Sequence, residues 1–198
     1  MVFLSSYFHS FQRVSRPASA YGCTNYRLAY GTITEQFTEA INNGRIDVSF
    51  SGGREYDGDI EAERGSYIEK VFNKNKMDKI PNNFLSEGKQ NRVVGLFTDS
   101  YMNYIDERKH NEPSLIDMSV KALKLLKTSA KNGFFLMVEG GLIDKAHHQN
   151  WALRSMREVK ELDAAVKAVF EELSEEEREE TLIVVTADHG HTFTRRFK

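Results

Sequence analysis

Carboxylate and imidazole side chains gather directly after two apolar runs, FFLMV at 134–138 and TLIVVT at 181–186. These side chains are Glu139, Asp144, His147, His148, Asp188, His189 and His191. A mixture of oxygen and nitrogen donors suits zinc, whereas magnesium is satisfied by the carboxylates alone. Clustered acids repel one another and have raised pKa values unless a cation neutralises them. The pattern therefore predicts a site for divalent metal ions.

Two parallel strands joined by a helix would bring these side chains together. Both apolar runs are typical of strands that are covered on both faces of a sheet. An apolar stripe at helical spacing lies between them: Leu153, Met156, Val159, Leu162, Val166, Val169 and Leu173. Parallel strands present their carboxyl ends at one edge of the sheet, where open α/β sheets bind ligands. Gly140 and Gly141 let the backbone turn sharply there, so we expect one shared crevice.

The remaining segments predict further elements of an α/β fold with a mostly parallel sheet flanked by helices. The expected helices cover 32–42, a stretch near 67–73, and a stretch that opens at 112–114 and ends at 131–133. The expected strands cover 46–50 and 93–97. Pro113 suits the first turn of its helix, and Ser174 with Glu177 suits a capping box for a short helix.

The composition excludes several classes of protein. The 198 residues contain 27 Lys and Arg against 29 Asp and Glu, and a formal charge of -2 provides no field for steering polyanions. We therefore expect no nucleic-acid partner. Cys23 is the single cysteine, which excludes an internal disulfide and a zinc site built from cysteines. No apolar run reaches the roughly 20 residues that a transmembrane helix needs.

Each candidate also has an ordinary structural interpretation. Glu139 by itself is typical of a helix cap or a loop charge, and His147 beside His148 is typical of surface histidines. Only their joint placement at two strand ends favours a metal site. His9 and His110 lie outside this pattern, and we assign them no function.

Longer motifs resemble the alkaline phosphatases. The stretch GFFLMVEGGLIDKAHHQNWALRSMREVKELDAAV, followed by TLIVVTADHGHTF, is similar to the family's metal-binding segments. Upstream, RVSRPASAYGCTNYR, IDVSFSGGREY, VVGLFTDSYMNY and EPSLIDMSVKALKLL occur in the family's order. The resemblance implies that 11–198 form the central and C-terminal part of an alkaline phosphatase-like domain. Residues 1–10 are expected to be a poorly matched or non-native start, or a core strand, because they lack the basic segment and cleavage site of a signal peptide.

The resemblance also implies roles for individual residues. Asp144 and His148 match two ligands of a first zinc ion, and Asp188 and His189 match two ligands of a second. Two further matches are Glu139, at a magnesium ligand, and Arg27, at the guanidinium that holds two phosphate oxygens. His147 and His191 match positions that are not principal ligands in the family.

The activity implied by the resemblance is hydrolysis of small phosphate monoesters through a phosphoserine, with two zinc ions and one magnesium ion. Family members are periplasmic, secreted or lipid-anchored outside the cell, and they usually form homodimers. These features are expectations for the full-length family, and nothing in this sequence indicates a particular compartment.

The chain departs from the family pattern at several places. The nucleophilic serine in its Asp-Ser-Ala setting is absent, so we expect no catalytic nucleophile, a fragment of the family and little activity. The third histidine of the first zinc site would lie beyond Lys198. Arg16 replaces a hydroxyl that binds magnesium, and a cation there repels a divalent ion. Thr98 replaces an acid of a calcium site found in some animal members, so we expect no calcium there.

Two other functions compete with this interpretation. The chain could be a non-catalytic remnant that binds metal or phosphate through the same residues and Arg27. A sulfatase or mutase would need a cysteine or serine nucleophile ahead of the first metal ligand. Cys23 lacks sulfatase-like surroundings, so this class ranks last.

Overall fold

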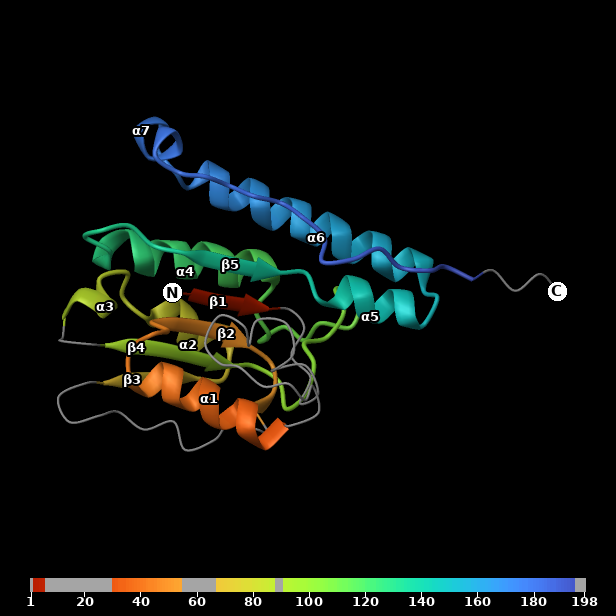
Figure 1. The fold of residues 1–198 in the computed structure, drawn as a ribbon, viewed down its shortest axis with the longest axis horizontal. Coiled ribbons are helices and arrows are strands. Elements are labelled where there is room, and N and C mark those ends of the chain that lie inside the picture. Colours follow the sequence, from red (N-terminus) through yellow and green to blue (C-terminus); the bar gives the residue numbers. More distant parts are fainter. Residues whose placement is uncertain (1, 6–29, 55–66, 88–90, 195–198) are drawn as a thin grey trace.

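A parallel sheet forms the centre of the molecule (Figure 1). The computed structural model describes residues 2–5, 30–54, 67–87 and 91–194. Its strands are β1 (Val2–Ser5), β2 (Val48–Ser51), β3 (Ile68–Val71), β4 (Arg92–Leu96) and β5 (Leu136–Glu139). They lie in the order β3-β4-β2-β1-β5, and every described pair is parallel. The predicted α/β class is therefore confirmed.

Helices cover both faces of this sheet. They are α1 (Tyr30–Asn42), α2 (Lys74–Lys79), α3 (Phe84–Glu87), α4 (Leu115–Ser129), α5 (Leu142–His148), α6 (Ala152–Glu171) and α7 (Glu175–Glu179). Successive residues of β4 point to opposite faces, because side chains alternate along a strand. Val93 accordingly packs in the core cluster shared with α4, and Val94 packs in the cluster shared with α1. Each face has its own apolar core.

Several predicted elements are confirmed by the structure. The helix expected over 32–42 is α1, with Phe37 and Ile41 buried, and the strands expected over 46–50 and 93–97 are β2 and β4. The expected capping box at Ser174 is present at the start of α7. A second capping box starts α4: Ser114 Oγ accepts a hydrogen bond from the Asp117 backbone N–H at 2.9 Å. Pro113 consequently lies before this cap and not in the first turn.

The helix expected near 67–73 is wrong. Residues 68–71 form β3, which pairs with β4 along the sheet edge. The helix begins later, at Lys74, because the Asn73 side chain accepts a hydrogen bond from the Lys76 N–H at 3.0 Å and caps α2. The segment pairs with a neighbouring strand, and this pairing outweighs its weak local preference for a helix.

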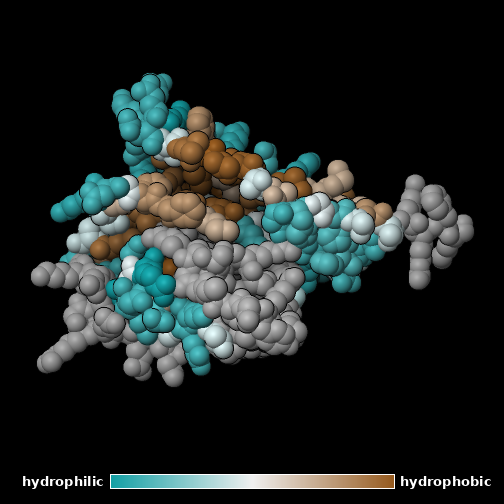
Figure 2. Space-filling view, in the orientation of Figure 1, coloured by the Kyte–Doolittle hydropathy of each residue, from teal (hydrophilic) through white to brown (hydrophobic). Residues whose placement is uncertain are grey.

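The strand expected over 181–186 is also wrong. These residues are extended, but no backbone hydrogen bond joins 182–187 to the rest of the described chain. Leu182 is 88% exposed, and Val184 and Val185 are exposed as well. β5 is consequently an edge strand of the described sheet with half-buried residues, and it is not covered on both faces as predicted. Figure 2 shows the resulting apolar area over α6, 181–186 and β5.

The apolar stripe of α6 is not the face that packs against the core. Leu153, Met156 and Val159 are exposed, contrary to the prediction, while Ser155, Glu158 and Glu161 are buried. At the C-terminal end of the stripe, the apolar residues do face the core as predicted: Leu162 packs against it, and Leu173 is buried.

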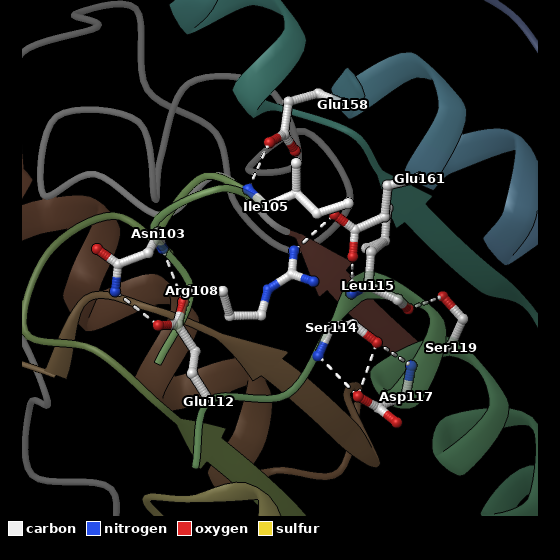
Figure 3. Close-up of polar contacts among 10 residues, drawn as sticks. All are labelled: Asn103, Ile105, Arg108, Glu112, Ser114, Leu115, Asp117, Ser119, Glu158 and Glu161. Carbon is white, nitrogen blue, oxygen red and sulfur yellow. Dashed lines mark hydrogen bonds and ion pairs between the residues drawn. The ribbon is translucent and has the colours of Figure 1, made fainter. Parts of the chain in front are cut away.

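Two buried carboxylates attach α6 to the first residue of α4 and to the segment before it (Figure 3). Glu158 accepts a hydrogen bond from the Ile105 N–H at 2.9 Å. Glu161 accepts one from the Leu115 N–H at 3.1 Å and forms an ion pair with Arg108 at 2.5 Å. Burial raises the pKa of Glu158 to about 7. The orientation of α6 is therefore set by polar contacts that its apolar periodicity does not reveal.

We predict that the Glu158 carboxyl makes stability depend on pH. Its pKa of about 7 in the folded chain exceeds the ordinary value of 4.5, so the folded state binds more protons between these limits. The free energy of unfolding should therefore fall by about 1–2 kcal/mol, relative to Glu158→Gln, as the pH rises through this range. Urea unfolding of both proteins at several pH values measures the difference. Parallel pH profiles would contradict the prediction. Gln retains the acceptor for the Ile105 N–H, which makes the comparison specific to the charge.

We predict that polar substitutions are tolerated at 182 and 184. The double variant Leu182→Lys, Val184→Lys should change the free energy of unfolding by less than about 0.5 kcal/mol, because both side chains are exposed. It should also reduce the binding of an apolar dye. Met118→Ala is the control, and it should cost about 2–5 kcal/mol because Met118 is fully buried. A comparable loss in the double variant would show that these residues are buried.

Candidate metal centre

The turn from β5 into α5 brings the first candidates to the edge of the sheet. Glu139 ends β5, and Asp144 and His148 lie four residues apart on α5, so both are on one face of that helix. The Asp144 Oδ2 and His148 Nε2 atoms are 3.4 Å apart. A Cβ atom on Gly140 would lie 3.1 Å from Ile143 Cδ1, which is tighter than ordinary packing. A larger residue at 140 would therefore require the Ile143 and Leu162 side chains to shift slightly.

The segment after 186 returns to this helix although it forms no strand. His189 Nε2 and His191 Nε2 lie 3.8 and 3.9 Å from Asp144 Oδ1. The segment is held beyond this point by Asn150, whose Oδ1 accepts hydrogen bonds from the Thr194 N–H and hydroxyl at 3.0 and 3.2 Å. The two segments thus meet as expected, but through this contact and not through strand pairing.

The Asp144 carboxylate is the centre of the cluster. Its side chain is 14% exposed, and both oxygens are buried with no hydrogen-bond partner among the described residues. The imidazoles around it lie at 3.4–3.9 Å, beyond hydrogen-bond length. A buried carboxylate without a partner is costly, and a bound cation removes that cost. This donor set of one carboxylate and several imidazoles fits zinc.

Hydrogen bonds to the imidazole rings determine which nitrogens can bind a metal. His189 Nδ1 and His191 Nδ1 each lie 2.8 Å from a backbone carbonyl oxygen. A carbonyl can only accept, so each Nδ1 atom donates in these contacts, and the Nε2 atoms are the ones that lie on the side of the acids. This is the arrangement that metal-bound histidines adopt. His147 Nε2 instead lies 2.8 Å from the Ser155 hydroxyl, outside the acid cluster.

The predicted residues differ in how closely they approach the cluster. Asp144, His148 and His189 meet there, and the exposed Asp188 lies beside His189, with Oδ2 at 3.3 Å from Nε2. Glu139 ends the adjacent strand β5. Arg27 and Arg16 lie outside the described residues.

His191, which the sequence did not predict as a ligand, also lies beside this cluster. Its ligand atom lies within 4.8 Å of those of Asp144 and His148. The spacing of two positions from His189 is the signal that could have indicated it, because alternate residues of an extended segment lie on the same side.

Aromatic rings support the helix that carries Asp144. Lys145 Nζ lies 3.1 Å from the centre of the Tyr101 ring and 5.6 Å from that of Tyr104. This is a cation–π arrangement. Burial lowers the pKa of Lys145 to about 8. The contact fixes α5 against the segment after β4.

Comparisons with known proteins agree with this architecture. The family profile described as Alkaline phosphatase matches residues 7–196. Alkaline phosphatase 4 of Drosophila melanogaster is 41% identical over 107 residues, which are 54% of this chain and 17% of the relative. The membrane-bound alkaline phosphatase of Bombyx mori is 36% identical over 141 residues, which are 71% of this chain and 24% of the relative.

A solved structure shares the fold. The cold-active alkaline phosphatase of a Shewanella species matches 85% of this chain and 40% of its own, with a TM-score of 0.65 and 24% identity. The chain thus spans about a fifth of the length of the curated relatives named above. Because the family profile covers nearly all of its residues, the chain belongs to the alkaline phosphatase family.

Proposed function

We propose that this protein takes part in phosphate monoester hydrolysis of the alkaline phosphatase type. The observation that carries the proposal is the buried Asp144 carboxylate, which has no described hydrogen-bond partner and faces three imidazoles. Membership of the family supports the reaction class. The substrates would be small phosphate monoesters, and the full-length protein would form a homodimer as its family usually does.

The proposed metal ligands follow the family resemblance. Asp144 and His148 would hold one zinc ion, Asp188 and His189 a second, and Glu139 a magnesium ion. Arg16, which stands where the family resemblance places a hydroxyl that binds magnesium, would weaken that site by repulsion. When bound, such ions supply positive charge that stabilises the attacking and leaving oxygens of a phosphoryl transfer.

The chain's own residues bind and orient the substrate. Arg27 would hold two phosphate oxygens through its planar guanidinium, which suits bidentate contact better than a lysine ammonium does. Asp144 lies between His148 and His189, at 3.4 and 3.8 Å, so one carboxylate could orient ligands on both sides. The contact of His189 Nδ1 with the Gly190 carbonyl orients the ring so that its Nε2 lies on the side of the acids.

This chain by itself should bind metal and phosphate but turn over little substrate. No serine occurs in the Asp-Ser-Ala setting of the family nucleophile. That absence also favours the second candidate, a non-catalytic remnant that binds metal or phosphate through the same residues. The two differ in whether any phosphate ester is hydrolysed.

We predict that the purified chain binds zinc through Asp144. Asp144→Asn should weaken zinc binding at least tenfold, since it removes the charge of the central ligand. Calorimetric titration with zinc, before and after treatment with a chelator, measures the affinity. Asp163→Asn on the exposed side of α6 is the matched control and should leave binding unchanged. Equal affinity in wild type and Asp144→Asn would contradict the proposal. Rapid hydrolysis of an aryl phosphate by this chain would contradict the expected low turnover.

We also predict that Arg27 contributes to phosphate affinity. Arg27→Lys retains the charge but loses the bidentate contact, so inorganic phosphate should bind the zinc-loaded chain about tenfold more weakly. Competition between phosphate and a coloured oxyanion measures this affinity. Lys131→Arg, an exposed change on another segment, serves as the control. An unchanged phosphate affinity in Arg27→Lys would remove Arg27 from the proposed site.

A further inference from the structure

We infer that the outward side of α6 is an interface at which two copies of this chain associate, with their α6 helices antiparallel across a twofold axis. The interface is a stripe of exposed side chains along one side of the helix: Leu153, Met156, Lys160, Asp163, Lys167 and Phe170. These side chains have no part in the proposed metal and phosphate sites. The inference therefore goes beyond the proposed function and does not depend on it.

The stripe has the spacing of a seam between two helices. Its members follow one another at intervals of three, four, three, four and three residues. This is the a and d spacing along which helices pair, and residues so spaced lie on one side of a helix. Leu153 and Met156 are each 63% exposed, and Phe170 is 46% exposed. A second helix can therefore reach the whole length of the stripe.

Contacts on the opposite side of α6 hold the stripe outward. Glu158 and Glu161 are buried there and accept hydrogen bonds from the Ile105 and Leu115 N–H groups. α6 packs against α4 and α5 and lies at the outside of the described fold (Figure 1). Rotating the helix to bury the stripe would break both hydrogen bonds. The stripe is thus a fixed surface that is available to a partner.

The residues of the stripe are complementary to the same stripe in an antiparallel second copy. The intervals read the same from both ends, so a twofold axis between Lys160 and Asp163 places each member opposite another member. Lys160 would lie opposite Asp163 of the partner subunit, and this ion pair would occur twice. At each end of the seam, Leu153 would lie opposite the partner's Phe170. Charge and apolar contact therefore match at the same time.

The remaining pair is compatible with this arrangement. Met156 would lie opposite the partner's Lys167, whose aliphatic stem can cover an apolar side chain while its ammonium group stays in water. Lys167 Nζ already lies 3.7 Å from Glu171 Oε1 of its own helix. A parallel pair of helices would instead bring Lys160 opposite Lys160 and Asp163 opposite Asp163. Like charges in a seam oppose pairing, so the antiparallel arrangement is favoured.

Charges near the stripe favour a second copy over a membrane surface. The two charged residues at the middle of the stripe, Lys160 and Asp163, are costly to insert among lipid chains. A run of glutamates follows α6 and repels anionic lipid head groups: Glu175, Glu176, Glu177, Glu179 and Glu180. The whole chain has a formal charge of only -2, which opposes the approach of two copies weakly.

Sedimentation velocity of the full chain over a range of concentrations, with a chelator present, tests the inference. Wild type should pass from monomer to dimer at micromolar concentrations. Lys160→Asp and Asp163→Lys should each weaken dimerisation at least tenfold, because each places like charges opposite each other. An equal mixture of these two variants should recover dimerisation, since both pairs across the axis are then opposite in charge. Mixing leaves the contacts within each helix unchanged, so the recovery reports contact between copies.

Two further variants complete the test. Leu153→Ser should also weaken dimerisation at least tenfold, and Lys76→Asp, an exposed change on α2, should dimerise as wild type does. Circular dichroism verifies that each variant is folded. A wild type that stays monomeric, a dimer that both charge reversals leave intact, or a mixture that does not recover would each overturn the inference. Monomers that bind vesicles of phosphatidylcholine through the stripe would overturn it in favour of a lipid surface. None of these outcomes bears on zinc binding, so the proposed function is tested separately.

Discussion

The burial of the Asp144 carboxylate is the constraint on which the site depends. Taking a charged oxygen pair away from water costs free energy unless a partner compensates, and the described chain offers no hydrogen bond. The groups around it are imidazoles, two of which contact backbone carbonyls through Nδ1 and lie with Nε2 toward the carboxylate. Such a cluster is unfavourable without a bound ion and is well suited to bind a divalent cation. The arrangement of α5 and of the segment after 186 is best understood from this need.

In α6, too, polar contacts decide which face of the helix is buried, and the apolar stripe does not. Glu158 and Glu161 are buried because Glu158 accepts a backbone hydrogen bond from Ile105, before α4, and Glu161 accepts one from Leu115, the first residue of α4. Arg108 neutralises Glu161, whereas Glu158 has a raised pKa. These contacts rotate the helix so that Leu153, Met156 and Val159 face outward. The exposed apolar area in Figure 2 follows from this rotation and from the unpaired state of 181–186.

The sequence alone was sufficient for much of the fold and for the general chemistry of the site. Apolar spacing predicted α1, β2 and β4, because local periodicity decides which face of an element is buried. The helix cap at Ser174 and the start of a helix near Ser114 were also predicted, because both depend on neighbouring residues in the chain. The types of donor, carboxylate and imidazole, indicated a metal centre before any geometry was known, and the motifs around Asp144 and Asp188 indicated the family.

Only the tertiary structure decided which donors meet and which faces are buried. Residues 68–71 became a strand because β4 offered a pairing edge, and 181–186 remained unpaired although their composition favours a strand. His191 lies near Asp144 and His148, and the Asn150 contact holds the segment just beyond it. These outcomes depend on contacts between residues far apart in the chain. Residue type and spacing specify what a side chain can bind, and the folded arrangement specifies which partner is within reach.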